Sequence, residues 1–94
     1  MEMPKVSKCD VNECAYNSKG MCHAMAITIG DSKNPQCDTF CSSASEGIDT
    51  SFLAGVGACK TTSCSYNKGL ECSASEISVG YNNNDVDCLT FQSR

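Results

Sequence analysis

The sequence predicts a small metal-stabilised protein: two tandem four-cysteine zinc modules with short antiparallel β-strands and much irregular structure. Two observations carry this prediction. Eight of the nine cysteines in 94 residues recur with a nearly fixed offset, and large apolar side chains are scarce, with no Trp, three Phe and three Tyr. A unit of fewer than about 40 residues rarely folds without a metal, disulfides or a partner. We therefore expect cysteine chemistry, rather than a large hydrophobic core, to hold each unit together.

Eight of the nine cysteines fall into two series of similar spacing, C-x4-C-x7-C-x14-C and C-x4-C-x7-C-x15-C. An offset of 50 residues relates the first three members of the series, and an offset of 51 relates the fourth. The two series are Cys9, Cys14, Cys22 and Cys37, and Cys59, Cys64, Cys72 and Cys88. Tyr16-Asn17 likewise recurs as Tyr66-Asn67, which indicates a tandem duplication of one module.

The duplication divides the chain into four segments. They are an N-terminal tail at 1–8, a first module at 9–41, a linker at 42–58 and a second module at 59–92. In the linker, Ile48, Phe52 and Val56 recur at helical spacing, which indicates a short helix. We expect this apolar patch to pack between the modules; the alternatives are an exposed docking surface for a protein partner and a disordered linker.

Each module is predicted to contain a turn, a strand and a polar loop, in that order. Asn and Gly favour the turn, alternation of apolar with small or polar residues indicates the strand, and a run of Asn, Asp and Ser indicates the loop. The predicted turns are 16–20 and 66–69, the strands 25–29 and 77–81, and the loops 31–35 and 82–85.

Four cysteines in so short a segment are typical of three chemistries: a tetrahedral zinc site, a pair of disulfides, or iron bound singly or as a cluster. The first residues form no apolar export signal and the cysteine count is odd, which argues against disulfides. The C-x2-C elements that iron sites favour do not occur. We therefore predict two Zn²⁺ ions, one for each cysteine series, each contributing roughly 10–16 kcal/mol to folding. A thiol/disulfide redox protein is the alternative function.

His23 and Cys41 lie beside the cysteine series but are not repeated, because they align with Ser73 and Gln92. We expect His23 to be a surface or packing residue. For Cys41 the alternatives are a spare thiol, an exchanging ligand and an intermolecular disulfide. The acidic run at 82–87 lacks the Gly and the terminal Glu of an EF-hand, which favours a solvated loop.

The composition also argues against several function classes. Seven basic against eleven acidic residues give a net charge of −4, whereas proteins that bind nucleic acid carry a basic face. Two four-thiolate zinc sites would move this charge to about −8. The sequence has no apolar run near the roughly 20 residues of a membrane span. Four thiolates leave zinc no open coordination position, so we predict a non-enzymatic, cytoplasmic monomer with room for a protein partner.

Three motifs run through residues 9–40: C-x-V-x-x-C-x-Y-N, C-x-A-x-x-I-x-I-G and C-D-T-F. Together they resemble a small family from anaerobic and spore-forming Gram-positive bacteria, known as domain of unknown function 1540. Residues 59–91 match more loosely, because Thr61 replaces the Val, Leu89 replaces the Asp and one residue is inserted before Cys88. The resemblance implies four metal-binding cysteines per repeat and a reducing, cytoplasmic setting. It implies no particular activity.

Overall fold

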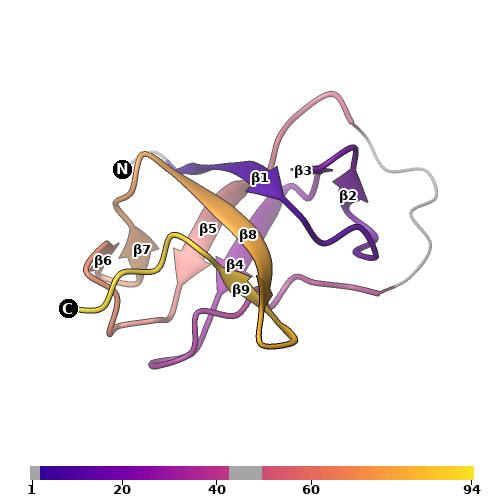
Figure 1. Ribbon diagram of the computed structural model, residues 1–94. Coiled ribbons are helices and arrows are strands. Elements are labelled where there is room, and N and C mark those ends of the chain that lie inside the picture. The colour runs from indigo at the N-terminus through magenta and orange to yellow at the C-terminus, as the bar shows by residue number, and fades with distance from the viewer. Residues whose placement is uncertain (1–2, 43–49) are drawn as a thin grey trace.

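The computed structural model describes residues 3–42 and 50–94, and within them it contains short strands and no helix (Figure 1). The strands are β1 (Lys5–Cys9), β2 (Asn17–Ser18), β3 (Met21–Cys22), β4 (Ala26–Ile29), β5 (Gly55–Cys59), β6 (Asn67–Lys68), β7 (Glu71–Cys72), β8 (Glu76–Asn82) and β9 (Asp85–Cys88). Among these residues no helix is available to cross a membrane. The prediction of short strands in an irregular chain is confirmed.

One five-stranded sheet, in the order β4-β5-β1-β8-β9, forms the centre of the molecule. Strands β5 and β1 are antiparallel, whereas β1 pairs with β8 and β4 pairs with β5 in parallel. The all-antiparallel arrangement that the sequence suggested is therefore wrong. It fails because the strand before the first cysteine of each repeat pairs with a strand of the other repeat, and not within its own.

The sheet has an approximate two-fold symmetry that follows the sequence repeat. Lys5 stands opposite Gly55 in the central pair, and these two residues are 50 positions apart. On one side Val6 pairs with Ile77, on the other Val56 pairs with Ile27, and both ladders carry an irregularity directly after this pair. The hairpins β2-β3 and β6-β7, one from each repeat, lie at opposite ends of the molecule (Figure 1).

The segment 35–38 joins the two outer strands of the sheet. It pairs with β4 on one side and with β9 on the other, through bridges between Ile29 and Cys37 and between Gln36 and Asp87. The backbone hydrogen bonds are Gly30 N to Gln36 O (2.8 Å), Asp38 N to Thr28 O (2.9 Å), Cys37 N to Val86 O (2.7 Å) and Cys88 N to Pro35 O (2.7 Å). Hydrogen bonding therefore continues around the sheet and covers both of its edges, which would otherwise expose unpaired backbone groups.

Both repeats contribute to a single hydrophobic core. Its largest fully buried side chains are Ile27, Ile77, Val6, Val11, Val79 and Thr61. Full burial of an aliphatic side chain of this size stabilises the fold by about 1.5–3 kcal/mol. The two repeats thus pool apolar residues that would be too few for either of them alone.

The structure differs from the predicted segment boundaries at both predicted connections. Residues 5–8, assigned to a tail, belong to β1, because Val6 is apolar and fully buried in the shared core. Residues 55–58, assigned to the linker, belong to β5, and residues 50–58 contain no helix. Val56 is buried by strand pairing with β4, and the flanking glycines disfavour a helix. Ile48, the first residue of the predicted helix, lies outside the described residues.

Candidate metal centres

The structure brings the four cysteines of each repeat to the wall of one small cavity, with one cavity per repeat. In each repeat the first cysteine ends a strand of the central sheet, the second follows in a loop and the third ends a hairpin. The fourth differs, because Cys37 lies on the segment that closes the sheet and Cys88 ends strand β9. The first cluster is Cys9, Cys14, Cys22 and Cys37, and the second cluster is Cys59, Cys64, Cys72 and Cys88. The first three members of each cluster are buried, and the fourth is partly buried.

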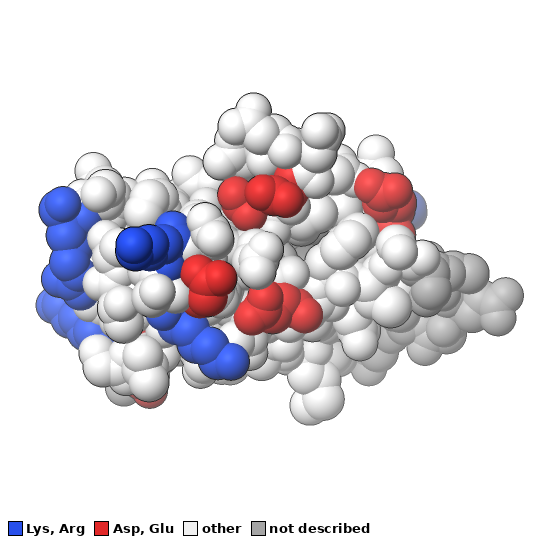
Figure 2. Space-filling view, turned by 90° about the horizontal axis from the view of Figure 1, so that it is seen from below, with Lys and Arg blue, Asp and Glu red and all other residues white. Residues whose placement is uncertain are grey.

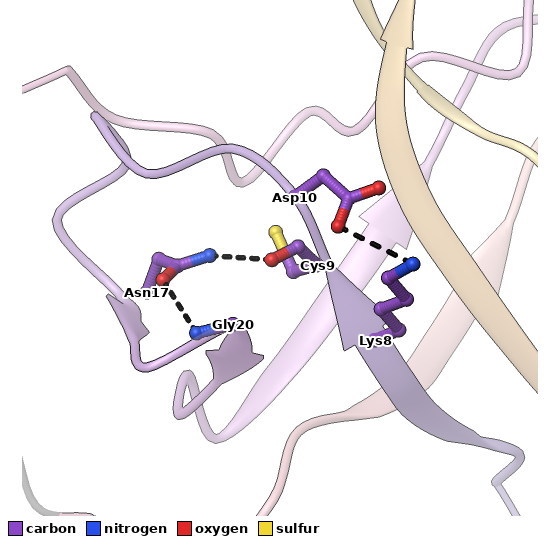
Figure 3. Close-up of polar contacts among 5 residues, drawn as sticks. All are labelled: Lys8, Cys9, Asp10, Asn17 and Gly20. Atoms are coloured by element: carbon purple, nitrogen blue, oxygen red, sulfur yellow. Dashed lines mark hydrogen bonds and ion pairs between the residues drawn. The ribbon is translucent and has the colours of Figure 1, made fainter.

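An asparagine at the same place in each repeat ties the hairpin to the first cysteine. Asn17 Nδ2 donates to the carbonyl of Cys9 at 2.8 Å, and its Oδ1 accepts from Gly20 N at 3.3 Å (Figure 3). Asn67 Nδ2 donates to Cys59 O at the same distance. Both asparagines are buried, so these bonds hold each hairpin, which carries the third cysteine of its cluster, against the strand that carries the first.

The third and fourth cysteines of each cluster accept hydrogen bonds from backbone N–H groups. Ala24 N–H donates to the sulfur of Cys22, and the N–H groups of Thr39 and Phe40 donate to that of Cys37. The second repeat places Ala74 against Cys72 and Thr90 with Phe91 against Cys88. Such bonds stabilise a negatively charged sulfur and lower the pKa of the thiol. The backbone is therefore arranged to receive thiolates.

Burial raises the pKa of the same thiols, and this effect is larger than that of the hydrogen bonds. It raises the pKa of Cys37 and of Cys88 to about 11, and it raises the pKa of Cys22 and of Cys72 as well. The charges of neighbouring cysteines of the same cluster contribute to the raised pKa of all four, after burial. Four thiolates therefore cannot share either cavity unless a cation compensates their charge.

The cavities match the size of a single ion. Their volumes are about 10 Å³ at the first cluster and about 20 Å³ at the second, close to the 10–15 Å³ that about one water molecule requires. Within residues 3–42 and 50–94, no three His, Cys, Asp or Glu side chains lie close enough to one another to hold a metal ion in the present arrangement. The donor set and the space thus fit one thiophilic cation per cluster, provided that the thiols converge on it.

His23 and Cys41 lie outside both cavity walls. His23 is buried, and its Nδ1 is 2.8 Å from the carbonyl oxygen of Phe52, which places it as a packing residue. Cys41 is exposed, and its carbonyl accepts from Ala15 N at 2.6 Å. The aligned Gln92 offers its carbonyl to Ser65 N at the same distance, so the two repeats share the backbone role of this position rather than its side chain.

The sequence did not predict that each cavity would also be lined by the other repeat. Val79 and Val86 line the first cavity, and Ile29 and Pro35 line the second. Strand patterns alone could not reveal this exchange, because duplicated strands suit pairing within a repeat and between repeats equally well. A further difference concerns Thr61, whose buried hydroxyl has no hydrogen-bond partner and which lines the second cavity where Val11 lines the first.

The comparisons with known proteins agree with the duplication. No curated protein and no solved structure matches the chain. The family described as Domain of Unknown Function (DUF1540) matches twice, at residues 8–43 and 58–91, once for each repeat. Each matched segment contains one complete cysteine cluster. The chain therefore belongs to the DUF1540 family, of whose domain it carries a tandem repeat.

Proposed function

We propose that this protein is a non-enzymatic binder of two structural Zn²⁺ ions, one at each cysteine cluster. The observation that carries the proposal is the placement of all four thiols of a repeat around one cavity of single-ion size, repeated by the two-fold symmetry. Four sulfur donors in tetrahedral arrangement are the characteristic ligands of closed zinc sites.

The residues of each cluster would act together on the bound ion. The four thiols lose their protons and supply sulfur ligands, and the N–H groups of Ala24, Thr39 and Phe40 in the first repeat hold the thiolates in place. When bound, Zn²⁺ supplies the positive charge that offsets the repulsion among thiolates in a buried site. Because four thiolates complete the coordination sphere, no position remains for a substrate or water, which supports a structural role.

The surface charge favours a protein partner over nucleic acid. The net charge of −4 would become about −8 with both sites loaded. Figure 2 shows the basic side chains on its face gathered mainly toward the end that holds β6, β7 and the C-terminus, with acidic groups over the middle. Phosphate binding requires a basic surface that follows the backbone, whereas on this face the basic groups are confined mainly to one end and acidic groups cover the middle. A reducing, cytoplasmic setting, which keeps thiols available to metal, belongs to the same proposal.

Native mass spectrometry of the full-length chain, purified without a reductant, together with elemental analysis, tests the proposal. We expect a mass increase of two zinc ions that is lost on acidification, after which eight further cysteines become open to alkylation. Cys41→Ser is the control and retains both ions, whereas Cys14→Ser and Cys64→Ser each lose one. If elemental analysis finds iron in place of zinc, the proposed metal is wrong and the proposed sites hold iron. A metal-free chain lacking two hydrogens per bridge would instead support the thiol/disulfide redox function.

A further inference from the structure

The first cysteine of each cluster stands on a strand that pairs with the other repeat. Cys9 is opposite Val79 in the parallel pair of β1 and β8, and Cys59 is opposite Ile29 in the pair of β5 and β4. The backbone bonds next to these cysteines are Asp10 N to Val79 O (3.0 Å) and Lys60 N to Ile29 O (2.6 Å). The position of one ligand in each cluster therefore depends on a strand of the opposite repeat.

The fourth cysteines are linked more directly. Cys37 N donates to the carbonyl of Val86 and Cys88 N donates to the carbonyl of Pro35, both at 2.7 Å. The segment that carries Cys37 is thus hydrogen-bonded to the strand that carries Cys88. Val86 also lines the first cavity, and Pro35 lines the second. Fixing either fourth cysteine at a metal fixes the backbone on which the other one stands.

From this geometry we infer that the two metal centres are positively coupled, so that an ion at one cluster increases the affinity of the other. The inference rests on the proposed zinc function. Metal at the first cluster orders β1 and the segment 35–38, which are the pairing partners of β8 and β9. The second ion then binds to strands that are already ordered, so its binding costs less conformational entropy. This gives cooperativity without any contact between the ions.

The coupling makes zinc binding by the chain cooperative. Couplings between sites in proteins usually change affinity by about 5–150-fold, and the same factor applies in both directions. We expect at least a tenfold effect, since two of the four ligands in each cluster depend on the opposite repeat. The empty and the doubly loaded chain are then the main species, and the singly loaded chain is a minority.

The decisive experiment measures the zinc affinity of one cluster with and without the other. Cys14→Ser/Cys22→Ser disables the first cluster, Cys64→Ser/Cys72→Ser disables the second, and Cys41→Ser is the matched control. Reduced, metal-free full-length chains are titrated with Zn²⁺ against a chelator of known affinity. A loss of about tenfold or more at the remaining cluster of both double variants, relative to the control, supports the coupling. A clearly smaller loss, or a loss in only one of the two double variants, overturns it and leaves the proposed zinc binding intact.

Native mass spectrometry of the unaltered chain decides the question should the double variants fail to fold. At half-saturation, two independent and equal sites leave half of the molecules singly loaded, whereas tenfold coupling reduces this fraction to about a quarter. A fraction closer to a quarter than to a half, or smaller, supports the inference, and any larger fraction contradicts it. A chain that takes up no zinc at all refutes the proposed function and the coupling together.

Discussion

The two repeats share one framework and differ in the residues that fill it. Val11 becomes Thr61, and the turn residues Lys19 and Gly20 become Gly69 and Leu70. The hydrogen bonds around the clusters nevertheless recur at nearly the same distances in both repeats. Cysteine placement and strand pairing between the repeats therefore define the fold, whereas single side chains in the second repeat impose local energetic costs that the fold tolerates.

The one-residue insertion before Cys88 has a structural consequence of its own. In the first repeat the chain turns through 31–35, where the carboxylate of Asp31 accepts from the N–H groups of Asn34 and Lys33, which lower its pKa. In the second repeat, Asn83 and Asn84 both have positive φ and form a tight two-residue turn. Strand β8 is therefore seven residues long, whereas β4 has four.

The largest effect should come from removing one ligand in either repeat. Cys14→Ser and Cys64→Ser are each expected to destabilise the whole zinc-loaded chain by more than about 3 kcal/mol, because a buried charged cluster loses a partner and its ion. Thermal unfolding followed by circular dichroism measures this, with Cys41→Ser as the control. Loss of only the half of the structure that carries the mutation would show that the repeats fold separately.

The dependence of stability on pH should reverse between the metal-free and the zinc-loaded chain. Burial raises the pKa of Cys37 and Cys88 to about 11 from 9.0, so the metal-free fold is favoured while these thiols are neutral. Its stability is complete below pH 9.0 and decreases as the pH rises toward about 11. The zinc-loaded chain needs thiolates and is instead destabilised in acid, where protons displace the ion.

Urea denaturation between about pH 5 and about pH 11, with and without zinc, measures this reversal. Zinc should broaden the alkaline range of stability and should add nothing at the acid end. Profiles that coincide with and without zinc would show that the buried thiols take no part in binding.

Exchanging the residues at positions 11 and 61 should change stability in opposite directions. Thr61→Val removes a buried hydroxyl without a partner and is expected to raise the free energy of unfolding by about 1–2 kcal/mol. Val11→Thr places the same hydroxyl in the first repeat and should lower it by a similar amount. Chemical denaturation of both variants measures the difference. A destabilising Thr61→Val would mean that this hydroxyl has a partner in the protein in solution.

The smallest effect is expected at the turn of each hairpin. Leu70 has a φ of 67° and is 54% exposed, so Leu70→Gly should relieve backbone strain and stabilise the chain by about 0.5–1 kcal/mol. Gly20 has a φ of 81°, and nothing lies within 4 Å of an added Cβ. Gly20→Leu should therefore destabilise by about 1 kcal/mol through backbone conformation alone. Shifts of the thermal midpoint report both, and equal signs for the two variants would refute this explanation.

The sequence predicted local features better than their arrangement. The strands around Ile27 and Ile77 were correctly indicated by alternating apolar residues, and the turns after Asn17 and Asn67 by Asn and Gly. The division into clusters followed from the cysteine spacing, and the structure places each set of four around its own cavity.

The pairing of strands between the two repeats could not be predicted from the sequence. Val6 and Val56 precede the first cysteines in equivalent positions. Their apolar character indicates burial, but it does not predict which strand each of them pairs with. Single buried residues between polar or glycine neighbours also gave too little periodicity to reveal β1 and β5. The choice of partner depends on how the whole chain closes around the shared core, and no local pattern contains that information.

X-ray absorption at the zinc edge of the reduced, loaded chain tests the central claim most directly, since it measures which atoms surround the ion. Two four-thiolate centres predict an average of four sulfur neighbours at about 2.3 Å and no nitrogen or oxygen in the first shell. Fewer than four sulfurs with light atoms in their place, as expected for zinc held at the surface or by His23, would contradict the account.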